Sequence, residues 1–170
     1  MKNLGKIFED NWRKSVPNYA FYYRFRDSGS TFYGGNQNLR FSASNIADCF
    51  INDPRTGLHL IEQKNHKGKS IPLSCIIGTR KNDKPTTKER QIVDLYEANK
   101  YTGVFSHLVV FFSDVERCFS LPINKLIRFI KEEDRKSIPI EYFEENGEEI
   151  RVEKLRTNYR FDIDKWLNRH

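Results

Sequence analysis

The chain has 170 residues, 38% of them hydrophobic and 14% aromatic, and its 29 Lys and Arg exceed its 23 Asp and Glu to give a net charge of +6. This size predicts one domain over residues 1–170, and the aromatic content excludes a disordered basic tail. The longest apolar run, at 108–112, is too short for a membrane span, no signal peptide is visible, and three scattered cysteines exclude a disulfide scaffold or a structural zinc site. We therefore expect a cytoplasmic protein with no membrane partner, whose charge is common among nucleic-acid binders.

Apolar periodicity and turn residues predict a helix at the start of the chain, followed by an aromatic strand and a loop rich in Gly, Ser and Asn. Within that loop we expect a short projecting stalk at about residues 34–44. Two short strands then flank a strong turn signal at 52–57 and are expected to pair as a hairpin. The predicted helix, strand, loop and two hairpin strands span residues 3–15, 19–26, 28–44, 45–51 and 58–64.

The second half of the chain is expected to alternate helices with strands: a helix, a central apolar strand, a neighbouring strand, a helix and a terminal helical turn. These elements span residues 86–99, 105–112, 117–121, 123–132 and 163–167. A further turn is predicted at 145–147, flanked by the segments 138–143 and 148–152. This order of elements predicts an α/β fold, with a mixed β-sheet and helices on its faces.

The chemically informative stretch combines Asp48, in the first hairpin strand, with Glu62 and Lys64 in the second. Strand side chains alternate, so Glu62 and Lys64 project from the same face of the sheet, and the hairpin brings Asp48 beside them. Two carboxylates and an ammonium on one face suit a divalent-metal phosphodiesterase, because Mg²⁺ binds carboxylate oxygens, activates water and polarises a phosphate. The lysine then offsets negative charge that grows in the transition state. This layout is similar to that of the PD-(D/E)xK nucleases.

Each of these residues also has a simpler interpretation. Taken alone, Glu62 and Lys64 also fit a surface ion pair at the end of a strand, since charged residues alternate on any solvated strand face. Asp53 is a second candidate for the first acid, but it lies in the predicted turn, where Asp is expected for its side-chain hydrogen bonds. We prefer Asp48, because a carboxylate in an otherwise apolar strand start needs a partner or a metal.

Five ordered pieces of the chain resemble the RecU family of Holliday junction resolvases, which is found in bacteria and some of their phages. The most specific piece is Leu-Ile-Glu-Gln-Lys at 60–64 followed by Lys-Ser-Ile-Pro-Leu at 69–73, which resembles the family's E-x-K and S-F-P-L. The other pieces are Gly-Lys-Ile-Phe-Glu, Gln-Ile, Arg-Lys-Ser-Ile and Tyr-Arg-Phe-Asp, at 5–9, 91–92, 135–138 and 159–162. Together they cover nearly the whole chain in order.

This resemblance implies a restriction-endonuclease-like fold and a homodimeric endonuclease that cuts four-way DNA junctions in recombination and repair. The implied cofactor is Mg²⁺, for which Mn²⁺ is expected to substitute. Carried over by position, the residues around the metal are Asp48, Glu62 and Gln91. Lys64 is then the group that stabilises the transition state, and Glu9 supports the site from the first helix. For Glu9 and Gln91 an ordinary solvated helix position is the simpler alternative.

The chain departs from the family pattern around the first acid and in the stalk. Ile46 stands two residues before the aspartate, where the family has a small polar residue, and no glycine follows soon after it. The stalk at 34–44 is also shorter than the one in the family. Ile46 could offer a metal only its backbone carbonyl, whereas the shorter stalk affects the expected grip on a junction more than the expected hydrolysis.

Basic and aromatic residues around the proposed site are the candidates for contacts with DNA, because phosphate contacts supply most of the affinity of such proteins. These candidates are Arg24, Arg26, Arg40, Phe41, Lys67 and Lys69. A solvated loop is the simpler alternative for the lysines. The adjacent Gly34 and Gly35 form no phosphate-binding loop, since no Gly-Lys-Ser/Thr follows them, and we expect no nucleotide cofactor.

Two other functions stay open from the sequence: a restriction-like or repair endonuclease acting on linear duplex DNA, and a non-catalytic basic DNA-binding protein whose acids are structural. Symmetric cleavage of a junction needs two active sites, so we expect a two-fold homodimer. The first helix, with Phe8 and Trp12, and the aromatic strand at 19–25 supply apolar area for that contact.

Overall fold

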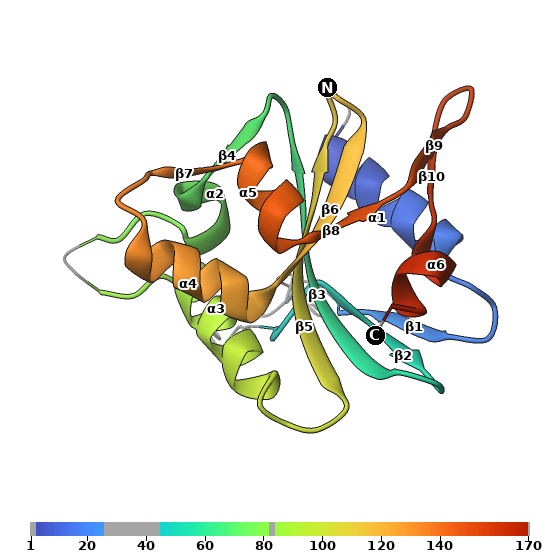
Figure 1. Cartoon of the computed structure of the whole chain (residues 1–170), viewed down its shortest axis with the longest axis horizontal. Coiled ribbons are helices and arrows are strands. Elements are labelled where there is room, and N and C mark those ends of the chain that lie inside the picture. The colour runs from blue at the N-terminus through green and yellow to red at the C-terminus, as the bar shows by residue number, and fades with distance from the viewer. Residues whose placement is uncertain (1–2, 26–44, 82–83, 170) are drawn as a thin grey trace, which may run out of the picture.

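The computed structural model describes residues 3–25, 45–81 and 84–169. Its centre is a mixed sheet of six strands in the order β1-β2-β3-β5-β6-β8 (Figure 1). These strands are β1 Phe21–Arg24, β2 Cys49–Asp53, β3 Gly57–His66, β5 Val104–Phe112, β6 Arg117–Pro122 and β8 Glu148–Ile150. β3 and β5 run parallel, whereas the other neighbouring strands run antiparallel. The structure thus confirms the predicted α/β fold, and its mixed sheet flanked by helices is consistent with a restriction-endonuclease-like fold.

Helices cover both faces of this sheet. In Figure 1, α2 to α5 lie on one side of the sheet, and α1, α6 and the β9–β10 hairpin lie on the other. The helices are α1 Leu4–Ser15, α2 Leu73–Ile77, α3 Thr87–Ala98, α4 Ile123–Glu132, α5 Ile140–Asn146 and α6 Ile163–Leu167. Two small antiparallel pairs complete the fold: β4 Ser70–Pro72 with β7 Ser137–Pro139, and β9 Val152–Lys154 with β10 Tyr159–Phe161.

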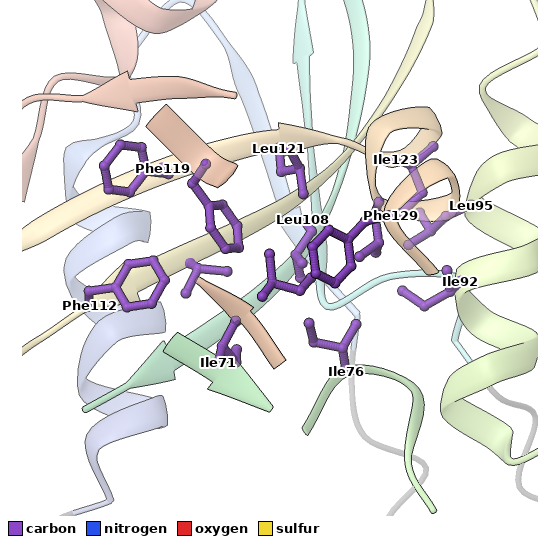
Figure 2. Packing of buried hydrophobic residues seen from close by; sticks show 14 of the residues in the cluster. Ile71, Ile76, Ile92, Leu95, Leu108, Phe112, Phe119, Leu121, Ile123 and Phe129 are labelled. Atoms are coloured by element: carbon purple, nitrogen blue, oxygen red, sulfur yellow. The ribbon is translucent and has the colours of Figure 1, made fainter. Parts of the chain in front are cut away.

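The larger hydrophobic core lies between the sheet and α2 to α5. Alternation along β5 decides which residues enter it: Leu108 and Val110 belong to this core, whereas Val109 belongs to the core on the opposite face. Figure 2 shows residues of the helices that pack there, among them Ile76, Ile92, Leu95 and Phe129. This core fixes α3 against the sheet, and α3 carries one of the predicted site residues.

A second, aromatic core fills the space between the sheet, α1 and α6. Phe8 and Trp12, four residues apart on one face of α1, are 2% and 0% exposed. The Phe8 ring stacks on Phe111 with centroids 5.6 Å apart, and Trp12 meets Trp166 of α6 edge to face at 5.8 Å. The expectation that Phe8 and Trp12 supply a surface for a second copy is therefore wrong, because they fill the core of their own chain.

Most of the predicted elements are confirmed. The helices expected at 3–15, 86–99, 123–132 and 163–167 are α1, α3, α4 and α6. The first hairpin strand, expected at 45–51, instead begins at Cys49 and runs to Asp53, because the ladder continues until Asp53 pairs with Gly57. Gly57 closes this ladder with a φ of 116°, in the backbone region that favours glycine.

Two further segments need comment. Residues 140–143, expected beside a turn at 145–147, begin helix α5, because Ile140 and Phe143 lie three residues apart and bury one helical face. The stalk expected at 34–44 lies outside the described residues. In the part of the chain that the structure covers, every helix is too short or too polar to cross a bilayer.

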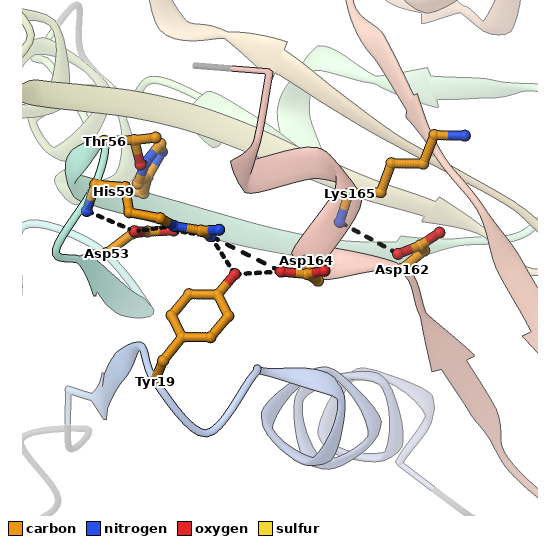
Figure 3. A network of polar contacts seen from close by, with 8 residues as sticks. Tyr19, Asp53, Thr56, His59, Asp162, Asp164 and Lys165 are labelled. Carbon is orange, nitrogen blue, oxygen red and sulfur yellow. Dashed lines mark hydrogen bonds and ion pairs between the residues drawn. The ribbon is translucent and has the colours of Figure 1, made fainter.

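A polar network connects the tip of the β2–β3 hairpin to α6 (Figure 3). The buried Asp53 carboxylate accepts hydrogen bonds from the Arg55 backbone N–H at 2.8 Å and from its guanidinium at 2.7 and 3.0 Å. The guanidinium lies 4.2 Å from the centre of the Tyr19 ring, whose hydroxyl donates to Asp164 of α6. Asp53 therefore makes the turn hydrogen bond expected of it, and Arg55 already neutralises its charge.

Candidate active site

Glu62, Lys64 and Gln91 meet where β3 lies against α3. Alternation along β3 places Glu62 on the same face as Leu60, the face that α3 covers. Its Oε1 accepts a hydrogen bond from Lys64 Nζ at 2.5 Å, and its Oε2 accepts one from Gln91 Nε2 at 2.8 Å. The Glu62 side chain is only 3% exposed and that of Lys64 is 19% exposed. Two donors from separate elements therefore fix a nearly buried carboxylate.

The start of α3 determines where Gln91 lies. Thr86 caps the helix, with its hydroxyl accepting from the Glu89 N–H at 2.9 Å. Ile92 and Leu95 are buried and dock the helix on the sheet. Gln91 immediately precedes Ile92 and lies at the border of the buried face of α3. Its amide therefore reaches Glu62 on the face of the sheet that α3 covers.

Asp48 lies directly before β2 and is held in place through its backbone and its side chain. Its N–H donates to the Ile61 carbonyl at 3.1 Å, and its own carbonyl accepts from the Phe25 N–H at 3.0 Å. Its Oδ2 accepts a hydrogen bond from the Gln63 N–H at 2.7 Å. The Asp48 carboxylate is consequently a close neighbour of Glu62, whose pKa it raises.

The charges of this cluster act strongly on one another. Burial is the main reason that the pKa of Glu62 rises to about 7; Lys64 opposes that rise and Asp48 adds to it. Burial alone would lower the pKa of Lys64, but the carboxylates of Glu62, Asp48 and Glu9 together raise it above its ordinary value. Lys64 is therefore protonated at neutral pH. Its positive charge reduces the repulsion between the neighbouring carboxylates of Asp48 and Glu62.

Glu9 approaches the cluster from α1, on the other face of the sheet. α1 contacts the end of β3, where the Asn65 amide donates to the Leu4 carbonyl at 3.1 Å. The Glu9 carboxylate forms an ion pair with Arg24 of β1, and their side chains are 22% and 39% exposed. Glu9 thus lies close enough to act on Lys64, whereas Arg24, expected to contact phosphate, is engaged with Glu9.

The other residues expected to contact DNA are spread over the chain. Lys67 and Lys69 are exposed in the loop that follows β3, and that loop is held by the Gly68 N–H, which donates to Asp114 at 2.9 Å. Arg26, Arg40 and Phe41 lie outside the described residues. The structure therefore brings together Asp48, Glu62, Lys64 and Gln91, with Glu9 nearby.

The donors of this cluster fit Mg²⁺. Asp48 and Glu62 offer adjacent hard carboxylate oxygens, which Mg²⁺ prefers, and Gln91 carries a neutral amide oxygen. As the amide lies, its nitrogen faces Glu62 and orients that carboxylate. Within residues 3–25, 45–81 and 84–169, no group of three or more His, Cys, Asp and Glu is arranged to hold a metal ion. Two carboxylates suffice for Mg²⁺, which commonly keeps water and phosphate oxygens in its remaining positions.

Sequence reasoning missed two parts of this arrangement. The Gln63 N–H that holds Asp48 is a backbone donor. Any residue other than proline supplies such a donor, so the residue type at position 63 could not have predicted this contact. The ion pair of Glu9 with Arg24 joins a helix to the end strand of the sheet. Their opposite charges are visible in the sequence, but no local spacing relates them.

Comparisons with known proteins give a match to a protein family and a similarity to a prophage protein. A protein family described as Recombination protein U matches residues 80–165, a range that begins before α3 and includes Gln91. A protein of Bacillus subtilis (strain 168), the SPbeta prophage-derived uncharacterized protein YotM, is 30% identical over 177 residues. That alignment spans 96% of this chain and 84% of the relative. The family match leaves out Asp48 and Glu62, whereas the similarity to the prophage protein extends over nearly the whole chain.

Proposed function

Because the chain belongs to the Recombination protein U family, a family of DNA-binding nucleases of recombination, we propose that it is a Mg²⁺-dependent endonuclease that resolves four-way DNA junctions. We propose further that residues 1–170 act as one nuclease domain in the cytoplasm. The observation that carries the proposal is the cluster of Asp48, Glu62 and Lys64. A surface ion pair is solvated, whereas Glu62 is 3% exposed and has a second carboxylate beside it. Buried like charges are costly for stability and are typical of catalytic sites.

Each residue of the cluster has a role in this proposal. Asp48 and Glu62 hold Mg²⁺, and Gln91 orients the Glu62 carboxylate through its 2.8 Å hydrogen bond. When bound, Mg²⁺ supplies polarisation of the scissile phosphate and a lower pKa for the attacking water. Lys64 remains protonated and directs positive charge at the phosphate, where negative charge grows in the transition state. Glu9 helps to keep Lys64 charged by raising its pKa.

Symmetric resolution of a junction needs two such sites, so we propose that the protein acts as a homodimer. Strand β1 offers a surface for this contact, because it stands at the end of the sheet order and its Phe21 and Tyr23 are 61% and 44% exposed. These rings cluster with Phe25 and Phe50 at centroid distances of 5.6 to 5.8 Å. Exposed aromatic patches of this kind are typical of contacts between proteins.

The test is cleavage of a synthetic mobile four-way junction in Mg²⁺, with a linear duplex of the same sequence in parallel. We expect paired, symmetric cuts in the junction, weak cleavage of the duplex, activity with Mn²⁺ and none in EDTA. Glu62→Gln is expected to bind the junction without cutting it, whereas Glu97→Gln, at an exposed surface ion pair, is expected to behave as the wild type.

Two results would contradict the proposal in different ways. Equal cleavage of junction and duplex would indicate a nuclease of linear DNA. Binding by the wild type without cleavage in either metal, unchanged in Glu62→Gln, would indicate a DNA-binding protein whose acids are structural.

A further inference from the structure

Gln63 lies between Glu62 and Lys64 in β3, and alternation along the strand turns its side chain to the opposite face of the sheet. Its partner in the parallel ladder with β5 is Val109, which belongs to the aromatic core. Gln63 is only 6% exposed, and its buried Nε2 has no hydrogen-bond partner among the described residues. A glutamine in this position therefore costs stability, because a buried amide that stays unpaired loses its hydration.

Two successive residues, Asp48 and Cys49, hold Gln63 through its backbone and through its side chain. The Asp48 Oδ2 accepts a hydrogen bond from the Gln63 N–H at 2.7 Å, and the Cys49 thiol donates to the Gln63 Oε1 at 3.6 Å. Cys49 is completely buried, and burial raises the pKa of its thiol well above the ordinary value, with the Asp48 carboxylate adding to the rise. The sulfur therefore keeps the proton that this hydrogen bond requires.

These two contacts lie at the end of the ladder between β2 and β3. The register of the two strands begins with Cys49 opposite Ile61, and the Asp48 N–H donates to the Ile61 carbonyl at 3.1 Å. Glu62 follows directly in β3, just beyond this pair. The contacts of Gln63 with Asp48 and Cys49 therefore continue the link between the two segments at the point where both candidate metal ligands lie.

We propose that Gln63 is a positioning residue for the metal site, which fixes Asp48 relative to Glu62 from the opposite face of the sheet. This inference rests on the proposed function and adds a residue that acts through the two candidate ligands. The Gln63 N–H orients the Asp48 carboxylate, while the side chain, held by Cys49, fixes the backbone from which this N–H and the adjacent Glu62 project. A buried polar group that lowers stability is typical of a functional site.

The experiment compares the variants Gln63→Leu and Cys49→Ala with the control Cys118→Ala. Gln63→Leu keeps the backbone N–H and the approximate size of the side chain but removes its polar atoms. Cys118 is the matched control for Cys49, because both are completely buried in the aromatic core, whereas Cys118 lies on β6, which β5 separates from β3. Two quantities are measured for each protein: the free energy of unfolding by urea in EDTA, and the dissociation constant of Mg²⁺ from the dependence of Tm on its concentration.

We expect Gln63→Leu to bind Mg²⁺ about tenfold more weakly, the lower end of the range for groups that orient metal ligands. The Mg²⁺ concentration for half-maximal junction cleavage should rise by a similar factor. The unfolding free energy of Gln63→Leu in EDTA should equal or exceed that of the wild type, because the unpaired amide is gone. Cys49→Ala should weaken Mg²⁺ binding in the same direction. Cys118→Ala should lose stability as Cys49→Ala does, through the space left in the core, but keep the wild-type affinity for Mg²⁺.

Wild-type affinity for Mg²⁺ in Gln63→Leu would overturn this inference, while junction cleavage by the wild type left the proposed function standing. An equal loss of affinity in Cys118→Ala, or a loss in Gln63→Leu that accompanies a larger drop in stability than that of Cys118→Ala, would also overturn it, because the effect would then be one of core packing. A wild type whose Tm does not respond to Mg²⁺ and that cuts no junction would overturn both.

Discussion

Lys64 lies among three carboxylates, and this setting decides its protonation. Burial of an isolated lysine favours the neutral amine, whereas Glu62, Asp48 and Glu9 favour the ammonium and together raise the pKa above its ordinary value. The Lys64 side chain is 19% exposed, which leaves it access to a bound phosphate, while its ion pair with Glu62 fixes its position. A compact, protonated group in a fixed position is what stabilisation of a phosphoryl transition state requires.

Replacement of Lys64 tests this role directly. Lys64→Ala should lower the rate of junction cleavage by about 10² or more, the cost of losing a charge directed at the transition state. Lys64→Arg should restore little, because a planar guanidinium cannot take the place of a compact ammonium. The measurement is single-turnover cleavage at saturating protein. Cleavage by Lys64→Ala within about threefold of the wild type would contradict the assignment.

Replacement of Asp48 or Glu62 tests metal binding independently of catalysis. A ligand that binds only the folded protein stabilises it by RT ln(1 + [L]/Kd), about 2.7 kcal/mol at a hundredfold excess over Kd. Mg²⁺ should therefore raise the Tm of the wild type but not that of Asp48→Ala or Glu62→Ala. Both variants should also lose cleavage and keep DNA binding. Glu97→Gln, an exposed acid, serves as the control.

Two results would contradict the assignment of Asp48 and Glu62 as metal ligands. If Asp48→Ala and Glu62→Ala both cut junctions in Mg²⁺, the metal site lies elsewhere in the chain. A Tm that rises with Mg²⁺ equally in all proteins would mean that the ion binds at other acids.

At the scale of elements, the β2–β3 hairpin joins two polar regions. Asp48 and Glu62 lie toward one end, and the turn at the other end is tied to α6 by the network of Figure 3. A buried chain of hydrogen bonds leads inward from that turn: His59 Nε2 is 2.9 Å from Thr56, and His59 Nδ1 is 3.3 Å from His107 Nε2. The hairpin is thus anchored at the end that lies away from the cluster.

Asp53 should make the stability of the protein dependent on pH in the acid range. Hydrogen bonds from Arg55 lower the pKa of Asp53 below its ordinary value of about 3.9. Its contribution is therefore fully present above that ordinary value and is lost as the pH falls through the lowered pKa in the folded protein. Asp53→Asn should cost about 1.5–3 kcal/mol near neutral pH, the range for a hydrogen bond to a charged group.

Urea unfolding at several pH values checks this prediction. The difference in unfolding free energy between wild type and Asp53→Asn should be constant from pH 5 to 8 and shrink below about pH 4. Asp164→Asn, whose side chain is 58% exposed, should change stability much less. A difference that grew toward low pH would have the wrong sign for this network.

At the scale of the whole molecule, the sheet divides the chain into two cores, and the candidate site depends on both. α3 reaches Glu62 from the larger core, while α1 carries Glu9 in from the aromatic core. Elements distant in sequence thus meet at the end of β3. The remaining exposed aromatic residues of β1 lie beside this assembly, on a strand paired with β2.

We expect these β1 residues to support a symmetric dimer. Sedimentation in dilute, moderate-salt buffer should give about twice the chain mass of 20.2 kDa. Phe21→Ser/Tyr23→Ser should shift the protein toward the monomer, because it removes exposed aromatic area from the contact. Val93→Ser/Tyr101→Ser is the control, because it changes residues that are 49% and 72% exposed, one on α3 and one in the loop that follows it. A wild-type monomer that still resolves junctions by paired cuts would contradict the prediction.

The sequence by itself determined the features that arise from local spacing. Apolar residues three and four apart are sufficient for α1, α3 and α4, because a helix satisfies its own backbone hydrogen bonds. Alternation along a strand likewise places Glu62 and Lys64 on one face. The turn signal before Gly57 predicted both the hairpin and the hydrogen-bonding role of Asp53.

Only the tertiary structure decided which of these elements meet. The parallel pairing of β3 with β5 and the burial of Phe8 and Trp12 depend on contacts across the whole chain, which no local period encodes. The partner of Asp48 is a backbone N–H that has no residue signature. Glu9 meets Arg24 because α1 packs across the sheet. These cases share one physical reason. The periodicity of side chains determines structure over a few residues, whereas the candidate site is assembled by packing between elements that exists only in the complete fold.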